Sequence, residues 1–379
     1  MAAETGTETE SAHLRRALEL AEGGRGRVSP NPLVGAVIVS PSGEVIGEGF
    51  HAELGDLHAE RAALRDCRER GVDPTGATLF VTLEPCAHSG RQPPCSEALL
   101  EAGVARVVYA SEDPTGKASG RGPGILRDGG VDVELARGPE ASAARLLNQP
   151  FRKLARTGRP LVTYKAAMTL DGRVAAPGGD SRWISSAESR ELVHRRRGEC
   201  DAIAVGIGTV LADDPLLTAR PERGEGRNPL RVVFDTRARL PLDSALIGSL
   251  EEAPVLVVCS GEAPTAARSA LERAGAELLV APGGDPASRL AAALDELGRR
   301  ELGDLLLEGG PTLAGALFDA GEIDRMQLFV APVLLGAEGA RAVLEGKGAK
   351  RIAEGGRPLA VEHRSVGEDL LIDARLREW

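Results

Sequence analysis

Residues 77–103, ATLFVTLEPCAHSGRQPPCSEALLEAG, contain the pattern that decides the fold. ATLFVTL (77–83) is the kind of apolar, β-branched run that forms a buried strand, and CSEALLEAG (95–103), after a proline-rich loop, has the spacing of a helix. The next run, VARVVYA (104–110), predicts another strand. Strands that alternate with helices indicate an α/β fold with a mostly parallel sheet.

The alternation continues on both sides of this stretch and completes one domain. Upstream, we expect strands over about 33–39 and up to residue 51, and a helix over about 57–70. Downstream, VDVEL (131–135) predicts a strand and residues 139–148 predict a helix.

A second alternating set follows the stretch RKLARTGRP (152–160), which is basic and rich in turn-forming residues. We therefore expect a disordered acidic tail at 1–10, a first domain at 11–152 and a second domain at 160–379. The clearer strands of the second domain are expected at 161–167, 201–206, 230–235, 253–259, 276–281 and 303–308, with antiparallel edge strands at 326–331 and 359–376.

Composition excludes several classes of protein. An apolar fraction of 42% with 27% charged residues is ordinary for a globular chain. No apolar run approaches the roughly 18 residues of a membrane span, and the start of the chain does not resemble a signal peptide, so we expect a cytoplasmic protein without a membrane partner. The net charge of −10 and an aromatic fraction of 3% disfavour a nucleic-acid partner. Five cysteines, an odd number, argue against a disulfide framework.

One group of side chains indicates a metal site. His58, Cys86 and Cys95 could provide an imidazole and two thiolates to zinc, which leaves the fourth tetrahedral position for water. Zinc lowers the pKa of such a water to about 7, so hydroxide is available at neutral pH. Glu60 lies two positions after His58 and could transfer protons without binding the metal. HAE followed by PC and a second cysteine matches the signature of zinc-dependent nucleobase deaminases, although eight residues separate these two cysteines. A closed structural zinc site is the alternative, with His51 or His88 as the fourth ligand.

Four segments together resemble a known family, the bifunctional deaminase/reductase of riboflavin biosynthesis. They are SPNPLVGAVIV (29–39), GEGFH (47–51), HAE (58–60) and TLEPCAHSGRQPPC (82–95). The resemblance implies a cytidine-deaminase-like three-layer domain in which Zn²⁺ is bound by His58, Cys86 and Cys95 and Glu60 is the catalytic proton donor. It further implies that the pyrimidine and its phosphate contact Asn31, His51 and His88.

The second domain contains two glycine turns at strand ends, GIGT (206–209) and EGGPTLAG (308–315). Because ligands of α/β proteins bind at the carboxyl ends of strands, and helix N-termini bind phosphate, two such turns indicate a nucleotide site. There is no G-x-G-x-x-G fingerprint with its acidic partner, so a Rossmann fold is not indicated.

Four segments of the second domain also resemble the same family, in its reductase domain, which is similar in fold to dihydrofolate reductase. They are LVTYKAAMTLDGRVA (161–175), GGDSRWIS (178–185), DAIAVGIGTVLADDPLLTAR (201–220) and LLLEGGPTLAGAL (305–317). The resemblance implies an NADPH site and a site for the reductase substrate. NADPH contacts are expected from Ala167, Trp183, Thr209, Asp213, Gly310, Pro311, Thr312, Leu313, Ala314, Gly315 and Ala316. Substrate contacts are expected from Lys165, Asp171, Ser181, Arg197, Leu217, Arg220 and Glu308.

These observations predict a bifunctional enzyme acting on a phosphorylated pyrimidine. The first domain would deaminate a phosphoribosylated diaminopyrimidinone, and the second would reduce the ribosyl group of the product to ribityl with NADPH. We expect a homo-oligomer. Two other hypotheses remain: a cytosine or adenine deaminase with a non-catalytic second domain, and a nucleotide-binding module with structural zinc.

Overall fold

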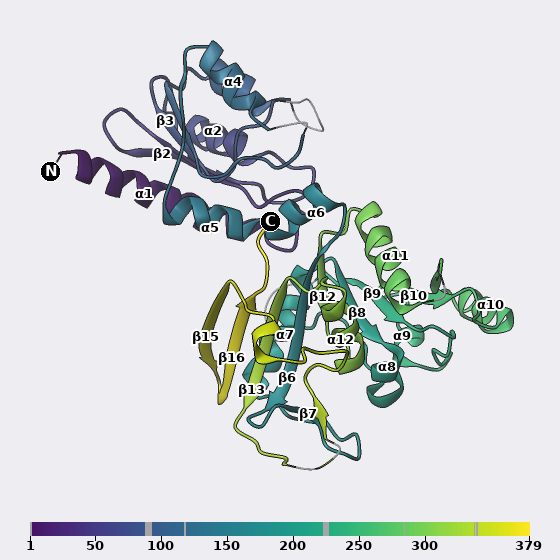
Figure 1. Cartoon of the computed structure of the whole chain (residues 1–379). Coiled ribbons are helices and arrows are strands. Elements are labelled where there is room, and N and C mark those ends of the chain that lie inside the picture. Colours follow the sequence, from purple (N-terminus) through teal and green to yellow (C-terminus); the bar gives the residue numbers. More distant parts are fainter. Residues whose placement is uncertain are drawn as a thin grey trace. The chain divides into compact units, whose positions relative to one another are not determined.

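The computed structural model describes residues 2–87, 93–116, 119–222, 227–283, 285–336, 338 and 340–379, and for residues 2–7 the main chain alone. The chain divides into two compact units, which are Met1–Thr157 together with Trp379 and Gly158–Glu378 (Figure 1). Among the described residues, no helix has the length and apolar character needed to cross a membrane.

The first unit alternates helices and strands along the chain. Its helices are α1 (Ala2–Ala21), α2 (Ala59–Glu69), α3 (Cys95–Glu101), α4 (Arg121–Asp128), α5 (Pro139–Leu147) and α6 (Gln149–Thr157). Its strands are β1 (Gly35–Val39), β2 (Val45–Phe50), β3 (Thr78–Val81), β4 (Arg106–Tyr109) and β5 (Asp132–Leu135).

These strands form one sheet in the order β2-β1-β3-β4-β5. The pairs β3–β4 and β4–β5 are parallel, and β1 is antiparallel to both of its neighbours. All five residues of β1 are buried because the sheet is covered on both faces. On one face, Ile38 packs with α2 residues such as Ala63, and on the other Val37 packs with Leu14 of α1. The first unit is therefore a three-layer α/β domain, as predicted.

Two segments of the first unit differ from the expectation. Helix α1 begins at Ala2, inside the stretch expected as a disordered tail, and an ion pair from Glu10 to Arg106 fastens it to β4. Residues 152–157 were expected to form turns, but they belong to α6. The side chains of Arg152 and Lys153 in this helix are buried.

The second unit repeats the pattern on a larger scale. Its helices are α7 (Ala187–Glu199), α8 (Ile207–Asp213), α9 (Ala245–Gly248), α10 (Thr265–Arg273), α11 (Pro286–Arg299) and α12 (Pro311–Asp319). Its strands are β6 (Leu161–Thr169), β7 (Arg173–Ala175), β8 (Ala202–Gly206), β9 (Leu230–Phe234), β10 (Val255–Ser260), β11 (Glu277–Ala281), β12 (Asp304–Leu307), β13 (Arg325–Ala331), β14 (Arg341–Ala342), β15 (Ala360–Val366) and β16 (Asp369–Arg375).

The main sheet of the second unit has the order β11-β10-β9-β8-β12-β6-β13-β16-β15 in the described part of the chain. The first seven strands are parallel to one another. β13 pairs antiparallel with β16, and β16 and β15 form an antiparallel hairpin at one edge. The expectation that residues 326–331 form an antiparallel edge strand is only partly confirmed. β13 does pair antiparallel with β16, but it also pairs in parallel with β6 along seven residues, so it lies inside the sheet and not at its edge. Apolar clusters fill both faces of the sheet, one against α11 and α12 and the other against α8, α9 and α10.

Candidate active sites

Three short segments of the first unit carry the side chains predicted to bind metal. His58 is the residue that caps the start of α2, Cys86 lies in the loop after β3, and Cys95 is the first residue of α3. Their ligand atoms lie within 4.8 Å of one another. His58 Nδ1 is 3.5 Å from the Cys86 sulfur and 3.3 Å from the Cys95 sulfur.

The charges of this group suit a divalent cation. The Cys95 main-chain N–H donates to the Cys86 sulfur at 3.3 Å. Hydrogen bonds from Cys95 and His58 overcome burial and lower the pKa of Cys86 to about 4. The hydrogen bond to Cys86 and burial raise the pKa of Cys95. One imidazole and two thiol groups so close together are the donor set that zinc prefers, so the residues present fit this metal.

Glu60 lies beside the three ligands without belonging to their group. It is in the first turn of α2 and is 4% exposed. Burial and the nearby Cys86 raise the pKa of Glu60 to about 7. A carboxyl group that exchanges its proton near neutral pH is suited to general acid and base catalysis.

His51 and Asn31 form the wall next to the metal-ligating group. The His51 ring is buried, and its centroid lies 5.7 Å from that of His58. His51 Nδ1 is 3.1 Å from the Leu57 carbonyl oxygen, so this nitrogen carries the hydrogen, and the Asn31 amide donates to Nε2 at 3.1 Å. Burial lowers the pKa of His51 and favours this neutral form.

The hydrogen bonds of His51 bear on the alternative of a closed structural zinc site. Since both of its ring nitrogens have partners, His51 is not available as a fourth ligand. His88, the other candidate, lies outside the described residues. Among the described residues, the possible metal-binding group contains His58, Cys86 and Cys95 and no fourth side chain.

Two further side chains hold this site together. Arg61 of α2 donates to the carbonyl oxygens of Pro93 and Pro94, directly before Cys95. The buried Glu84 accepts hydrogen bonds from the Gly120 and Asp113 N–H groups. The sequence alone does not indicate a role for either residue, because their partners are main-chain atoms with no side-chain signature.

The second unit contains a cavity of about 1210 Å³ at the carboxyl ends of its parallel strands. The two predicted glycine turns lie side by side there. A Cβ built on Gly310, before α12, would be 3.7 Å from the Thr209 hydroxyl of α8. The first turn of α12 opens into the cavity at Pro311 and Thr312. Its free N–H groups suit the phosphates of a dinucleotide, so the residues present fit NADPH.

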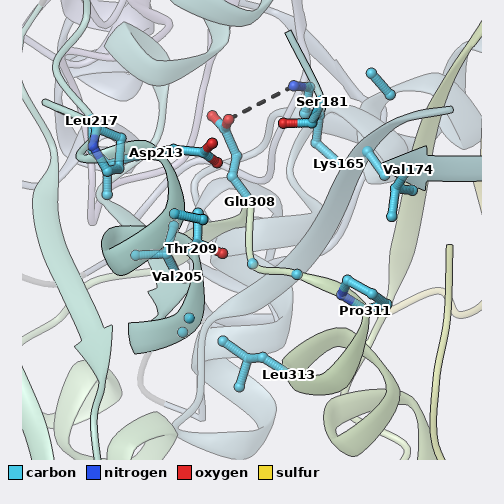
Figure 2. A pocket seen from close by; sticks show the side chains of 18 of the residues that line it. Lys165, Val174, Ser181, Val205, Thr209, Asp213, Leu217, Glu308, Pro311 and Leu313 are labelled. Carbon is cyan, nitrogen blue, oxygen red and sulfur yellow. Dashed lines mark ion pairs between the residues drawn. The ribbon is translucent and has the colours of Figure 1, made fainter. Parts of the chain in front are cut away.

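A buried carboxylate with two cations lies in this cavity. Glu308, directly after β12, accepts hydrogen bonds from Arg197 Nε at 2.8 Å and Nη2 at 3.0 Å. Lys165 Nζ of β6 lies 3.7 Å from the same carboxylate (Figure 2). Burial raises the pKa of Glu308, but Arg197 and Lys165 outweigh it and lower this pKa to about 2. Burial in turn lowers the pKa of Lys165.

The run His194-Arg195-Arg196-Arg197 at the end of α7 separates into distinct environments. Arg195 is exposed, and Arg196 pairs with Asp304 at 2.7 Å. Arg197 has a 13% exposed side chain and pairs with Glu308. Of the three arginines, only Arg197 reaches the cavity.

Most of the residues predicted for the reductase site line the cavity. Those that do are Lys165, Ala167, Ser181, Trp183, Arg197, Thr209, Asp213, Leu217, Arg220, Glu308, Gly310, Pro311, Thr312, Leu313 and Ala316. Ala314 is instead fully buried in the core, and Gly315 faces the Glu345 carbonyl. Asp171 does not line the cavity; its carboxylate accepts the N–H groups of Leu335 and Gly336.

The cavity extends beyond the predicted residues. Asp235 and Thr236 line it directly after β9, and Arg289 lines it from α11. The rule that ligands bind at strand ends could have identified Asp235 and Thr236. His194 also lines the cavity, and in the described part of the chain its buried Nδ1 has no hydrogen-bond partner. No sequence signal distinguished it or Arg289.

Comparisons with known families agree with this division of sites. Residues 160–372 match the family described as the RibD C-terminal domain. Residues 7–111 match the zinc-binding region of cytidine and deoxycytidylate deaminases, a range that contains all three predicted zinc ligands and Glu60.

Individual relatives match over nearly the whole chain. The chain is 37% identical over 367 residues to the riboflavin biosynthesis protein RibD of Actinobacillus pleuropneumoniae, covering 97% of this chain and 95% of that one. It is 38% identical to RibD of Escherichia coli, with 95% and 97% covered. RibD of Acinetobacter baumannii superposes with a TM-score of 0.85 at 36% identity, with 98% and 99% covered. A diaminohydroxyphosphoribosylaminopyrimidine deaminase/5-amino-6-(5-phosphoribosylamino)uracil reductase of Thermotoga maritima superposes with a TM-score of 0.82 at 33% identity, with 98% and 99% covered.

Proposed function

Because this chain belongs to the RibD family of riboflavin biosynthesis proteins, we infer that its two units catalyse two successive reactions. The first unit is a zinc-dependent deaminase of 2,5-diamino-6-(ribosylamino)-4(3H)-pyrimidinone 5′-phosphate. The second unit is an NADPH-dependent reductase that converts the ribosyl group of the resulting aminouracil to ribityl. The observation that carries this conclusion is that one chain contains both a His/Cys/Cys group beside Glu60 and a dinucleotide-sized cavity around Glu308.

In the first unit, we propose that His58, Cys86 and Cys95 hold Zn²⁺ and that Glu60 moves the protons. Zinc with three protein ligands keeps a position for water and lowers the pKa of that water to about 7. Deamination breaks the bond from a ring carbon to its amino group and forms a carbonyl at that carbon. Glu60 would take a proton from the attacking water and give it to the departing ammonia. Asn31, His51 and His88 are proposed to bind the pyrimidine and its phosphate.

In the second unit, NADPH supplies the hydride that the sugar carbon C1′ accepts. We propose that the Lys165–Glu308 pair moves the protons of this reaction. Opening the ribose ring requires a proton on the ring oxygen and removes one from the exocyclic nitrogen, and hydride addition then requires a proton at that nitrogen. An ammonium and a carboxylate 3.7 Å apart can give a proton to one atom and take one from another. Arg197 is proposed to keep Glu308 in place.

The other lining residues are proposed to bind the two ligands as the sequence analysis expects. The first turn of α12 and Thr209 would hold the NADPH phosphates, and Trp183 would cover part of the cofactor. We also propose a cytoplasmic location, since zinc binding requires reduced Cys86 and Cys95, and thiols stay reduced in that compartment. Finally, we propose that the protein is a homo-oligomer.

The test of this function is a two-stage assay with zinc-loaded protein. The diaminopyrimidinone ribotide is added first without NADPH, and ammonia is measured; NADPH is then added, and its absorbance is followed. We expect ammonia release in the first stage and NADPH oxidation in the second. Ammonia without NADPH oxidation would refute the reductase and support a deaminase with a non-catalytic second domain. No ammonia from folded, zinc-bound protein would refute the deaminase.

Matched variants separate the two activities. Glu308→Gln is expected to keep ammonia release and to lose NADPH oxidation. Glu60→Gln is expected to lose ammonia release and to oxidise NADPH normally when the deaminated aminouracil is supplied. A single variant that abolished both reactions would contradict the assignment of one site to each unit.

A further inference from the structure

One wall of the cavity in the second unit is formed by residues 214–220, a segment without helix or strand that directly follows α8. Asp214, Pro215, Leu216, Leu217 and Arg220 of this segment line the cavity. In the view of Figure 2, Leu217 lies on the opposite side of Glu308 from Lys165. Because the segment belongs to no helix or sheet, other contacts must fix its main chain.

The segment has a conformation that its residues do not favour. Asp214 and Leu217 have φ angles of 41° and 55°, in the left-handed region, where residues other than glycine are strained. A strained main chain persists only where the surrounding structure enforces it. The contacts on either side of Leu217 therefore decide how this wall meets a ligand.

Arg231 of β9 holds the main chain directly before Leu217. Its side chain is fully buried, and its Nη1 donates to the Leu216 carbonyl oxygen at 3.1 Å and to the Ser249 hydroxyl at 2.6 Å. Its Nη2 donates to the carbonyl oxygens of Ser249, at 2.9 Å, and of Ala253. One planar guanidinium thus joins the 214–220 segment to the loop after α9.

The burial of Arg231 costs more free energy than packing requires. Its four acceptors are three main-chain carbonyl oxygens and one hydroxyl, none of which carries a negative charge. A buried charge is costly, and apolar side chains of similar volume often replace one without loss of stability. An apolar side chain at this position of β9 would leave the Leu216 carbonyl without its donor. The hydrogen bond to that carbonyl is therefore what an arginine provides here.

Asn228, just before β9, holds the main chain on the other side of Leu217. Its Oδ1 accepts a hydrogen bond from the Ala219 N–H at 2.8 Å, and its amide donates to the Glu252 carbonyl oxygen at 3.2 Å. Neither Asn228 nor Arg231 lines the cavity. The two side chains therefore act on the 214–220 segment from behind the wall.

We propose that Asn228 and Arg231 are positioning residues of the reductase. They fix the main chain of the 214–220 segment so that Leu217 and Arg220 are held where they contact the substrate. This inference rests on the proposed reductase reaction and deepens it by naming residues that act on the substrate site without touching either ligand.

The position of these hydrogen bonds separates the substrate from the cofactor. Thr209 and Asp213, which are expected to contact NADPH, belong to α8 and precede the segment. Leu217 and Arg220, which are expected to contact the substrate, lie within it. Loosening the segment should therefore weaken the use of the substrate and leave the use of NADPH unchanged. A residue that only stabilises the fold would lower the amount of folded protein and change neither Michaelis constant.

The test is the steady-state kinetics of NADPH oxidation with the deaminated aminouracil supplied. Asn228→Ala removes the acceptor of the Ala219 N–H, so we expect the KM for the aminouracil to rise about three- to tenfold, the size of one lost hydrogen bond. The KM for NADPH should stay at the wild-type value. Asn228→Asp keeps an acceptor oxygen for the same N–H and should return the KM for the aminouracil close to that of the wild type.

Arg231→Lys is the second variant. An ammonium group lacks the planar fork that reaches the Leu216 carbonyl and the loop after α9 together, so the same rise in KM is expected. This variant also leaves buried carbonyl groups without donors and should unfold at a lower temperature. Arg300→Lys is the matched control, because Arg300 bonds to Glu296 and Glu277 and does not line the cavity. Both Michaelis constants should be unchanged in it.

Hydrogen exchange measures the position of the segment independently of activity. In Asn228→Ala the Ala219 N–H has lost its acceptor, so a peptide that covers residues 214–220 should exchange faster than in the wild type. Peptides from α12 should exchange as in the wild type. Faster exchange at 214–220 together with a raised KM for the aminouracil alone supports the proposal.

The contrary results are distinct from one another. If the wild-type protein oxidises NADPH but Asn228→Ala and Arg231→Lys keep its KM for the aminouracil, the positioning role is refuted and the reductase stands. The same holds if Asn228→Asp is no better than Asn228→Ala, or if the KM for NADPH rises equally. If the wild-type protein does not oxidise NADPH with the aminouracil, the proposed reductase is refuted and this inference falls with it.

Discussion

Glu308 and Arg197 lie face to face in the cavity of the second unit, with two hydrogen bonds of 2.8 and 3.0 Å between the carboxylate and the guanidinium. Lys165 is 3.7 Å from the same carboxylate. A single anion thus balances two cations in a place where the Glu308 side chain is 9% exposed. Removing a partner from such a group leaves uncompensated buried charge, which is strongly destabilising.

Glu308→Gln is therefore expected to destabilise the second unit in a pH-dependent way. The folded-state pKa of Glu308, about 2, is below its ordinary value of 4.5, so the stabilisation is complete above pH 4.5 and is lost as the pH falls toward 2. A shift of this size corresponds to on the order of 3 kcal/mol. Hydrogen exchange of β6 and β12 peptides at pH 7 and at pH 3 measures it. The difference between wild type and variant should be clearly smaller at pH 3 than at pH 7, because the stabilisation is lost only in part until the pH nears 2. An equal difference at both would contradict the role of the charge.

Glu60→Gln is expected to reduce ammonia release by a factor of about 10² to 10⁴, the usual contribution of a positioned general acid and base. Because Glu60 is not part of the metal-ligating group, the variant should keep its zinc. Ammonia release and zinc content are measured on the same sample. Loss of zinc in this variant would show that Glu60 supports the metal rather than the proton transfer.

Cys95→Ser is expected to lose zinc on dialysis against a chelator under conditions in which the wild-type protein retains it. A hydroxyl group is a much poorer zinc ligand than a thiolate, and two ligands remain. The control is Cys67→Ser, which changes a buried cysteine outside the metal-ligating group. Zinc analysis of both variants after dialysis decides the outcome, and equal zinc retention would argue against Cys95 as a ligand.

Trp183→Ala is expected to weaken NADPH binding by about tenfold, because an aromatic ring that the cofactor covers contributes roughly 1–2 kcal/mol. Trp183 is 71% exposed, with Arg190 stacked at 4.6 Å from its ring centre. NADPH should quench its fluorescence on binding. The chain has two tryptophans, and the other, Trp379, belongs to the first unit. NADPH should still quench the fluorescence of the Trp379→Phe variant, in which Trp183 is the one tryptophan left. If NADPH does not quench the fluorescence of this variant, Trp183 does not lie at the cofactor.

Gly49→Ala is expected to destabilise the first unit by about 1–3 kcal/mol through overpacking. A Cβ at Gly49 would lie 2.3 Å from the Ala63 nitrogen of α2, the helix that His58 caps and that contains Glu60. Gly124→Ala is the matched control, because nothing lies within 4 Å of a Cβ there and alanine favours the α4 helix. Urea unfolding of both variants is the measurement, and equal stabilities would contradict the close approach of α2 to β2.

The fold class could be predicted because each unit alternates apolar strands with helices of clear periodicity. The helices expected at about 57–70 and at 139–148 correspond to α2 and α5. Strand pairing was harder to predict. β13 was expected at an edge, because its parallel partner β6 lies more than 150 residues earlier and nothing in either segment encodes the register between them.

The same limit applies to the two sites. His58 and Cys95 stand at the starts of helices and Cys86 stands in a short motif after β3, so local patterns are enough to identify them. Leu307 of β12 pairs with Tyr164 of β6 in the sheet. The residues that follow them, Glu308 and Lys165, are therefore neighbours. That contact depends on how β6 and β12 pair in the sheet. The family resemblance indicated both residues, but it did not indicate that they form a pair.

The presence of both units in one polypeptide has a consequence for the cell that makes it. Every translated copy delivers one deaminase and one reductase, so transcription and messenger turnover scale the two activities together. Their ratio is not open to adjustment by gene expression. The balance between the two steps is left to the rate constants of the two sites, and selection on that balance acts on coding sequence rather than on promoters.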